Sequence, residues 1–246
     1  LTIALAGNPN CGKTTMFNNL TGAHQHVGNW PGVTVERKSG IVNFDVKGCQ
    51  KGEVEVIDLP GTYSLSPFSR DEVVAADYLV DGNPDCILNI VDGTNLNRNL
   101  YLTTQLVELG IPVVIAINMI DVVKKRGDSI NIPKLSAKLG VPVVEVSAIS
   151  GEGLRKAIEE CRDAVEHKLL PAKQRIFSDS VENALANIEK TLPQNIDHIR
   201  FLAVKVFERD ERIVRFGASD DARKAAEPQI ETCEKLFGDD AVSQIA

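Results

Sequence analysis

The chain lacks the features that mark nucleic-acid-binding, secreted and membrane-spanning proteins. Among its 246 residues, 34 are acidic and 27 are basic, which gives a formal net charge of -7. Such a balance offers no excess positive charge to a phosphate backbone, so no nucleic-acid partner is expected. No apolar run approaches the roughly 20 residues that cross a bilayer, and no signal peptide is recognisable. We therefore expect this stretch of chain to be soluble.

Cysteine and aromatic residues are also scarce. The five cysteines lie far apart and form no C-x-x-C pair, which argues against a metal knuckle or a disulfide framework and favours a reducing cytosolic setting. Aromatic residues make up 5% and apolar residues 43% of the chain, as in ordinary globular domains. The first residue is not Met, and Ile245-Ala246 shows no evident terminus, so we expect a piece of a longer protein.

The most informative stretch is the phosphate-binding pattern G-x-x-x-x-G-K-[ST] between Gly7 and Thr14. It follows an apolar run and precedes an amphipathic helical pattern, as a strand, a tight loop and a helix would. In this arrangement backbone amides surround a phosphate, Lys13 adds a positive charge that stabilises the transferring phosphate, and the Thr14 hydroxyl holds Mg²⁺. The pattern predicts the nucleotide-binding residues Gly7, Asn8, Pro9, Asn10, Cys11, Gly12, Lys13, Thr14 and Thr15.

Apolar runs alternate with helical patterns over the first two-thirds of the chain. This alternation predicts an α/β fold with a mainly parallel central sheet flanked by helices and with ligands at the carboxyl ends of the strands. Strands are predicted over 2–6, 40–46, 54–57, 86–91, 113–118 and 141–146, and helices over 13–22, 70–81, 97–109, 132–139 and 153–167.

The strand signals fade after His167. Residues 168–175 read as a linker, and apolar residues then recur at helical spacing behind Ser178 or Ser180, from Ile199, and after Ser219. We predict a small all-helical domain of three to five helices, with Pro228 bending one of them. The predicted domains are a nucleotide-binding domain over 1–167 and a helical domain over 168–246.

Two motifs at predicted strand ends would complete the phosphate site. In Asp58-Leu59-Pro60-Gly61 the carboxylate can hold Mg²⁺ through water, and the Gly61 amide can approach a terminal phosphate. Thr34 lies between the first helix and the second predicted strand, where a mobile loop delivers a Thr hydroxyl to Mg²⁺ when the γ-phosphate is present. Gly32 and Val33 precede it and are predicted to contact the nucleotide.

Two further motifs select the base. Asp121, at the end of Asn118-Met119-Ile120-Asp121, can accept both N–H groups on one edge of guanine, while Asn118 ties the loops together. Adenine is disfavoured because a buried carboxylate facing an acceptor would be left unpaired. The segment Ser147-Ala148-Ile149 follows the next strand and can bring a backbone amide to the guanine carbonyl oxygen. Together the motifs predict a site for GTP and GDP.

The phosphate loop, the segment from Val27 to Lys38 and the continuation Asp58-Leu59-Pro60-Gly61-Thr62-Tyr63-Ser64-Leu65 resemble the cytosolic N-terminal part of the FeoB ferrous iron transport proteins. The resemblance covers the whole chain and implies a GTPase domain followed by the helical spacer that the family calls GDI-like. It also implies a following transmembrane domain that carries Fe²⁺, at the cytoplasmic face of the inner membrane. Small accessory Feo proteins and a homo-oligomer are further partners that it suggests.

The resemblance also implies how hydrolysis is helped. Thr62 stands where many small GTPases keep a water-orienting Gln, so intrinsic turnover should be slow. FeoB proteins resemble the potassium-activated GTPases, in which an Asn of the phosphate loop and two backbone carbonyls hold K⁺ beside the phosphates. Asn10 matches that Asn, and Gly28 and Trp30 match the carbonyl donors. Lys13, Asn10 and Thr34 are then the predicted catalytic residues.

Two other functions stay open at this level. A GTPase of ribosome assembly or tRNA modification shares the Asn-bearing phosphate loop, although the acidic balance and the Trp-Pro-Gly-Val-Thr segment weigh against it. A nucleotide-sensing switch with little turnover is compatible with Thr62. His24 and His26 flank the loop region without nearby carboxylates, which is more typical of solvated residues than of a metal site.

Overall fold

The computed structural model describes residues 1–246 except 23, 45–51, 67, 173–174, 195 and 246. The chain divides into two units, one formed by residues 1–107 and 111–172 and the other by residues 108–110 and 173–246. The first unit carries the sheet and the second is helical. The predicted boundary after His167 stays a prediction.

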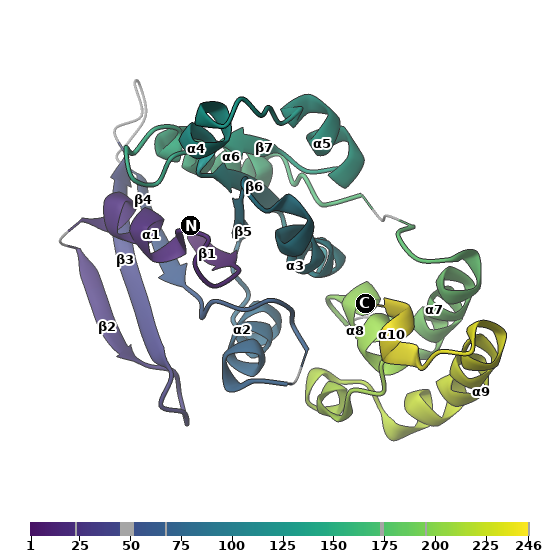
Figure 1. Cartoon of the computed structure of the whole chain (residues 1–246). Coiled ribbons are helices and arrows are strands. Elements are labelled where there is room, and N and C mark those ends of the chain that lie inside the picture. Colours follow the sequence, from purple (N-terminus) through teal and green to yellow (C-terminus); the bar gives the residue numbers. More distant parts are fainter. Residues whose placement is uncertain (23, 45–51, 67, 173–174, 195, 246) are drawn as a thin grey trace. The chain divides into compact units, whose positions relative to one another are not determined.

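A seven-stranded sheet with the order β2-β3-β4-β1-β5-β6-β7 forms the centre of the first unit (Figure 1). β4, β1, β5, β6 and β7 run parallel to one another, whereas β3 is antiparallel to both β4 and β2. The strands span Thr2–Gly7 (β1), Gln25–Asn29 (β2), Glu36–Phe44 (β3), Gly52–Asp58 (β4), Cys86–Asp92 (β5), Val113–Asn118 (β6) and Val143–Glu145 (β7).

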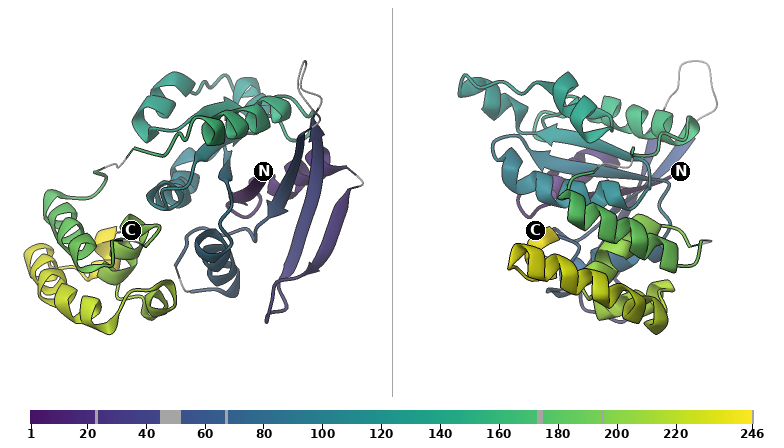
Figure 2. Two further views of the ribbon diagram at one scale, coloured as in Figure 1. Left: turned by 180° about the vertical axis from the view of Figure 1, so that it is seen from behind. Right: turned by 90° about the vertical axis from the view of Figure 1, so that its right-hand side faces the viewer.

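Helices cover both faces of the sheet (Figure 2). On one face Phe17 of α1 and Ile158 of α6 join Ile3 and Leu88 in one buried cluster. Alternate strand residues such as Ile87 and Ile115 point to the opposite face and are also fully buried. The helices of this unit are α1 (Lys13–Thr21), α2 (Arg70–Asp81), α3 (Leu96–Glu108), α4 (Ile120–Lys125), α5 (Ile132–Leu139) and α6 (Leu154–Glu166). The predicted α/β class, with a mainly parallel sheet, is confirmed.

Three elements differ from the sequence prediction. The strand β2 was not predicted because its residues are mostly polar and exposed, so that it lacks the apolar alternation of a half-buried strand. The helix α4 was missed because six residues are too few to show a helical period. β7 covers only the middle of the predicted 141–146 strand, and the end of the predicted 40–46 strand lies outside the described residues.

The second unit contains four α-helices and one 3₁₀ helix in its described part, within the predicted range of three to five helices. The side chains of Ser178 and Ser219 accept hydrogen bonds from the amides of Val181 and Ala222 and so begin α7 and α9. Pro228 lies inside α9 without ending it. The helices are α7 (Asp179–Thr191), α8 (Ile199–Phe207), the 3₁₀ helix η1 (Glu211–Phe216), α9 (Asp220–Phe237) and α10 (Ala241–Ile245). Among the described residues, no helix has the length and apolar character that crossing a membrane requires.

A buried arginine organises the charges of the second unit. The Arg200 side chain is only 10% exposed, and it lies 2.6 Å from Glu108 and 3.0 Å from Glu182, measured between nitrogen and oxygen. Burial raises the pKa of the Glu108 carboxyl, and the Arg200 guanidinium opposes that rise. Removing one partner of such a group leaves uncompensated charge in a poorly solvated place.

Replacing Arg200 with Met is therefore expected to lower the free energy of unfolding by about 3 kcal/mol. Urea unfolding followed by circular dichroism measures the loss. Arg175→Met is the matched control, because Arg175 forms a single pair with Asp179 at 3.0 Å in which both side chains are well exposed, and it should cost less than about 0.5 kcal/mol. Equal losses in the two variants would contradict the role given to burial.

Candidate functional site

The phosphate loop joins β1 to α1 through backbone conformations that few residues adopt. Asn10 has φ 65° and Gly12 has φ 90°, both in the left-handed region. A Cβ at Gly12 would come within 2.2 Å of the Asn118 side-chain nitrogen, so no larger residue fits there. The loop therefore curls tightly before α1 begins at Lys13, and the Cys11 amide donates to the Asn8 carbonyl at 3.2 Å within it.

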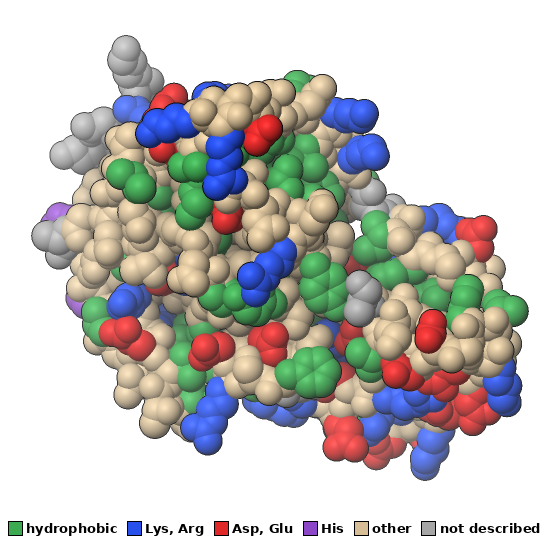
Figure 3. Space-filling view, in the orientation of Figure 1, with side chains coloured by type: hydrophobic (Ala, Val, Ile, Leu, Met, Phe, Trp, Pro, Cys, Tyr) green, Lys and Arg blue, Asp and Glu red, His purple; other side chains and the backbone are tan. Residues whose placement is uncertain are grey.

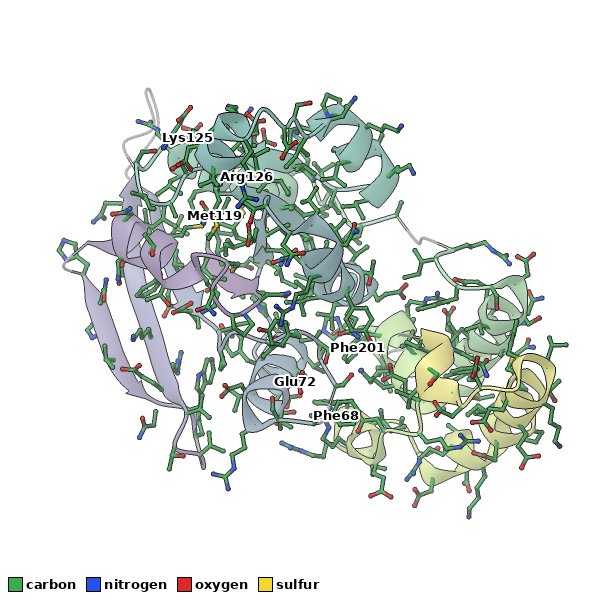
Figure 4. The ribbon with its side chains drawn as sticks, in the orientation of Figure 1. Phe68, Glu72, Met119, Lys125, Arg126 and Phe201 are labelled. Atoms are coloured by element: carbon green, nitrogen blue, oxygen red, sulfur yellow. The ribbon has the colours of Figure 1, made fainter. Side chains whose placement is uncertain are left out.

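A cavity of about 600 Å³ opens above this loop. Nine of its ten lining residues belong to the nucleotide-binding set predicted from the sequence, and Asp71 of α2 is the addition. Met119, labelled in Figure 4, brings the base-selecting motif to the same cavity. The lining consists of Asn8, Pro9, Asn10, Gly12, Lys13, Thr14, Thr15, Gly61, Asp71 and Met119.

Lys13 and Asp58 form an ion pair beside this cavity. The Lys13 ammonium donates to the Asp58 carboxylate, and both residues are less than a tenth exposed. A buried ammonium needs an anion nearby, and here the carboxylate at the end of β4 provides it. An incoming phosphate would compete for the same ammonium, which frees the Asp58 oxygens for another partner.

Asn118 connects the phosphate loop to the loop after β7. Its side-chain nitrogen donates to the Cys11 carbonyl at 2.8 Å, and its side-chain oxygen accepts from the Ala148 amide at 2.9 Å. Ser147 and Ala148 are buried and Ile149 is exposed. Asp121 is half-buried in the first turn of α4. One side chain thus holds the phosphate loop and the two motifs predicted to contact the base together.

The segment from Gly28 to Thr34 does not join the cavity in this structure. Gly28 pairs with Arg37 across the β2-β3 ladder, and the Trp30 carbonyl accepts from the Val33 amide. Trp30 is only 6% exposed, and its ring centroid lies 5.1 Å from that of Tyr78 in α2. Five predicted residues lie in this hairpin rather than in the cavity lining, namely Gly28, Trp30, Gly32, Val33 and the exposed Thr34.

Cys11 acts as a small buried residue. Burial is the main cause that raises the pKa of its thiol to about 11, so the thiol stays protonated at neutral pH. The four described cysteines are buried and free, and Cys49 lies outside the described residues. Among the described residues no group of three His, Cys, Asp or Glu side chains could hold a metal ion, and His24 and His26 are exposed.

Sequence reasoning missed the groups that hold the segment after Gly61. The Ser64 hydroxyl donates to Glu72 at 2.8 Å, and the Leu65 amide donates to Gln105 at 2.6 Å. Glu72 also completes a capping box with Ser69 at the start of α2. The S-x-x-E spacing of Ser69 and Glu72 is a signal for such a cap, whereas no local pattern points to Gln105.

Comparisons with known proteins agree with this geometry. A family model described as Ferrous iron transport protein B matches residues 1–161, and another described as FeoB cytosolic helical domain matches residues 177–246. The Fe(2+) transport protein A/Fe(2+) transporter FeoB fusion protein of Porphyromonas gingivalis is 45% identical over 224 residues, which cover 87% of this chain and 26% of that protein.

Solved structures match the chain over nearly its whole length. A mutant S. thermophilus NFeoB bound to GDP has a TM-score of 0.88 and 46% identity, covering 98% of this chain and 93% of that one. The mGMPPNP-bound NFeoB from S. thermophilus has a TM-score of 0.83 and 46% identity, covering 100% and 92%. This chain spans about a quarter of the length of the curated relatives that it matches. It belongs to the FeoB family of ferrous iron transport proteins.

Proposed function

We propose that this chain is the GTP-binding and GTP-hydrolysing part of a prokaryotic ferrous iron transporter. The observation that carries the proposal is the Asn118 bridge, because it joins a phosphate loop to the loops that the sequence assigns to guanine. The related structures hold GDP and mGMPPNP, which are ligands of this chemical class. Membership of the FeoB family supplies the link to Fe²⁺, which is the cargo.

The residues around the cavity fit a magnesium-dependent phosphoryl transfer. Thr14 lines the cavity, and Asp58 lies buried beside it, so a hydroxyl and a carboxylate offer the oxygen ligands that Mg²⁺ prefers, the carboxylate through water. Bound Mg²⁺ would neutralise charge on the phosphates. Lys13 would then turn from Asp58 to the transferring phosphate, and the Gly61 amide would contact that phosphate. Thr34 would offer Mg²⁺ a further hydroxyl oxygen once its hairpin closes.

A potassium ion fits the phosphate loop only in part. Asn10 lines the cavity with an amide side chain, whereas the Gly28 and Trp30 carbonyls lie in the β2-β3 hairpin. We propose that closure of this hairpin brings the two carbonyls to Asn10. A cation held there would balance negative charge between the β- and γ-phosphates, which is the task of an arginine finger elsewhere.

Slow intrinsic turnover follows from Thr62, which stands where many small GTPases have a water-orienting Gln. This residue is 4% exposed, and its amide donates to the Gly7 carbonyl at 3.2 Å. Such a short side chain, held at the base of the phosphate loop, cannot reach an attacking water in the way a Gln does. A nucleotide-sensing switch that barely turns over is the second candidate, favoured by this same observation.

The remaining assignments concern the whole protein. We propose that residues 1–167 form the nucleotide-binding domain and residues 168–246 the helical spacer, at the cytoplasmic face of the inner membrane. The transmembrane iron-permeation domain of the same protein is the main partner, with accessory Feo proteins and a second copy as further ones. An RNA partner is disfavoured because basic and acidic side chains are interspersed on the face in Figure 3.

Asp121→Asn is expected to shift base preference from guanine toward xanthine nucleotides. The amide nitrogen of Asn cannot accept the guanine N–H groups, but it can donate to the second carbonyl oxygen of xanthine. Isothermal titration with GDP and with XDP measures the shift. Unchanged selectivity for GDP would show that the base pocket is wrongly placed.

Asn10→Ala is expected to abolish the stimulation of GTP hydrolysis by K⁺ relative to Na⁺ while leaving GDP affinity within about threefold, because a single exposed ligand is lost. Phosphate release is measured for both proteins in both salts. Equal rates in all four reactions would rule out the cation mechanism while leaving the nucleotide site intact.

The single Trp in the chain reports on hairpin closure. Emission of Trp30 is expected to change on addition of Mg²⁺, K⁺ and a non-hydrolysable GTP analogue but not on addition of GDP, because only closure moves its ring away from Tyr78 and Arg37, whose guanidinium lies 5.2 Å from the ring centroid. Tyr78→Phe keeps the ring contact and should respond alike. Identical emission with both nucleotides would contradict this movement.

A further inference from the structure

The segment after the Asp58-Leu59-Pro60-Gly61 motif is more firmly held than a loop usually is. Thr62, Ser64, Leu65 and Ser66 are each less than a tenth exposed. Three consecutive residues have a partner from a helix, because the Tyr63 ring lies under Arg98, Ser64 donates to Glu72 and Leu65 donates to Gln105. Loops that bind or release ligands are usually less well secured.

The Leu65 amide has its hydrogen-bond acceptor in a distant part of the sequence. Its amide nitrogen lies 2.6 Å from the Gln105 side-chain oxygen, and the two residues are 40 positions apart in the sequence. Leu65 is 1% exposed and Gln105 is 8% exposed, so water cannot readily replace the acceptor. A buried amide without an acceptor is costly, which makes this bond a strong restraint on the backbone path.

The helix α3 contacts both the phosphate loop and the segment after Gly61. Arg98 lies seven residues before Gln105, which places both on one face of the helix. Its guanidinium lies 4.2 Å from the centroid of the Tyr63 ring, and its backbone carbonyl accepts from the Asn8 side chain at 3.2 Å. One rigid helix thus holds the phosphate loop and the segment after Gly61 at a fixed separation.

We propose that Gln105 is a positioning residue for GTP hydrolysis, acting through the Leu65 amide on the backbone that carries Gly61. This inference rests on the proposed function. Thr62 is tied to the Gly7 carbonyl at 3.2 Å, so the stretch between Gly61 and Leu65 is fixed at both ends. If the Gln105 end is released, the Gly61 amide loses its alignment with the γ-phosphate, whereas the contacts that bind GDP stay in place.

The side-chain chemistry of Gln105 suggests a sharp substitution pair. Its oxygen accepts from Leu65, and its nitrogen is buried without a hydrogen-bond partner among the described residues. Gln105→Glu keeps an oxygen acceptor at the same reach, whereas Gln105→Met keeps the length and removes the acceptor. Thr104→Val is the matched control, because the Thr104 hydroxyl donates to the Tyr101 carbonyl one turn earlier in α3 and to no other group in the part of the chain that the structure describes.

The experiment measures kcat, KM and GDP affinity for the wild type and these three variants in Mg²⁺ and K⁺. Gln105→Met is expected to lower kcat about tenfold while KM and the GDP Kd change less than about twofold, since the lost interaction matters only in the transition state. Gln105→Glu should recover most of kcat, and Thr104→Val should match the wild type. Equal kcat in Gln105→Met and the wild type, or a parallel loss of GDP affinity, would overturn the proposal.

A second measurement does not depend on turnover. GDP with aluminium fluoride imitates the transferring phosphoryl group, and Gln105→Met should weaken its binding about tenfold relative to GDP alone. If the wild type hydrolyses no GTP, the proposed function fails. The ratio of the affinity for GDP with aluminium fluoride to the affinity for GDP alone still tests Gln105. Should Gln105→Met not fold, the exposed Arg98 gives the test, with Arg98→Met reducing the ratio about threefold and Arg98→Lys keeping it. Unchanged ratios in all variants would overturn the proposal.

Discussion

The site depends on one side chain more than on any other. Asn118 donates to the phosphate loop and accepts from the loop after β7, and its nitrogen occupies the space that a Cβ at Gly12 would need. An Asn amide is suited to this because it offers a donor and an acceptor in one plane. Loss of either bond would loosen the connection between the loops that we propose contact the two ends of one nucleotide.

This bridge is possible because the sheet places the loops side by side. β1 pairs with β5, β5 with β6 and β6 with β7, all parallel, so the carboxyl ends of these strands share one edge. The order of strands in space differs from their order in the chain, and ligands gather where it does so. The sheet therefore determines where chemistry can occur, and the loops determine which chemistry it is.

The parts of the molecule that could be predicted are those with a local signal. The phosphate loop, the Asp58 motif and the Asn118 motif follow buried strands and carry residue types that the ligand demands, and the caps at Ser178 and Ser219 carry their own pattern. The rest depends on contacts between distant residues. β2 pairs with β3 without an apolar pattern of its own, and the Trp30 ring meets Tyr78 only after folding. Gln105 lies 40 residues from Leu65, whose amide donates to it. No window of sequence contains both partners of such contacts.

The buried thiol of Cys11 has a consequence for the chemical durability of the site. With a pKa of about 11, only about one thiol in ten thousand is a thiolate at pH 7, and the thiolate is the form that peroxides and electrophiles attack. A protein proposed to work beside ferrous iron meets such oxidants at close range. The phosphate loop thus carries a sulfur atom in a place where oxidation would block the nucleotide, and burial keeps that sulfur unreactive.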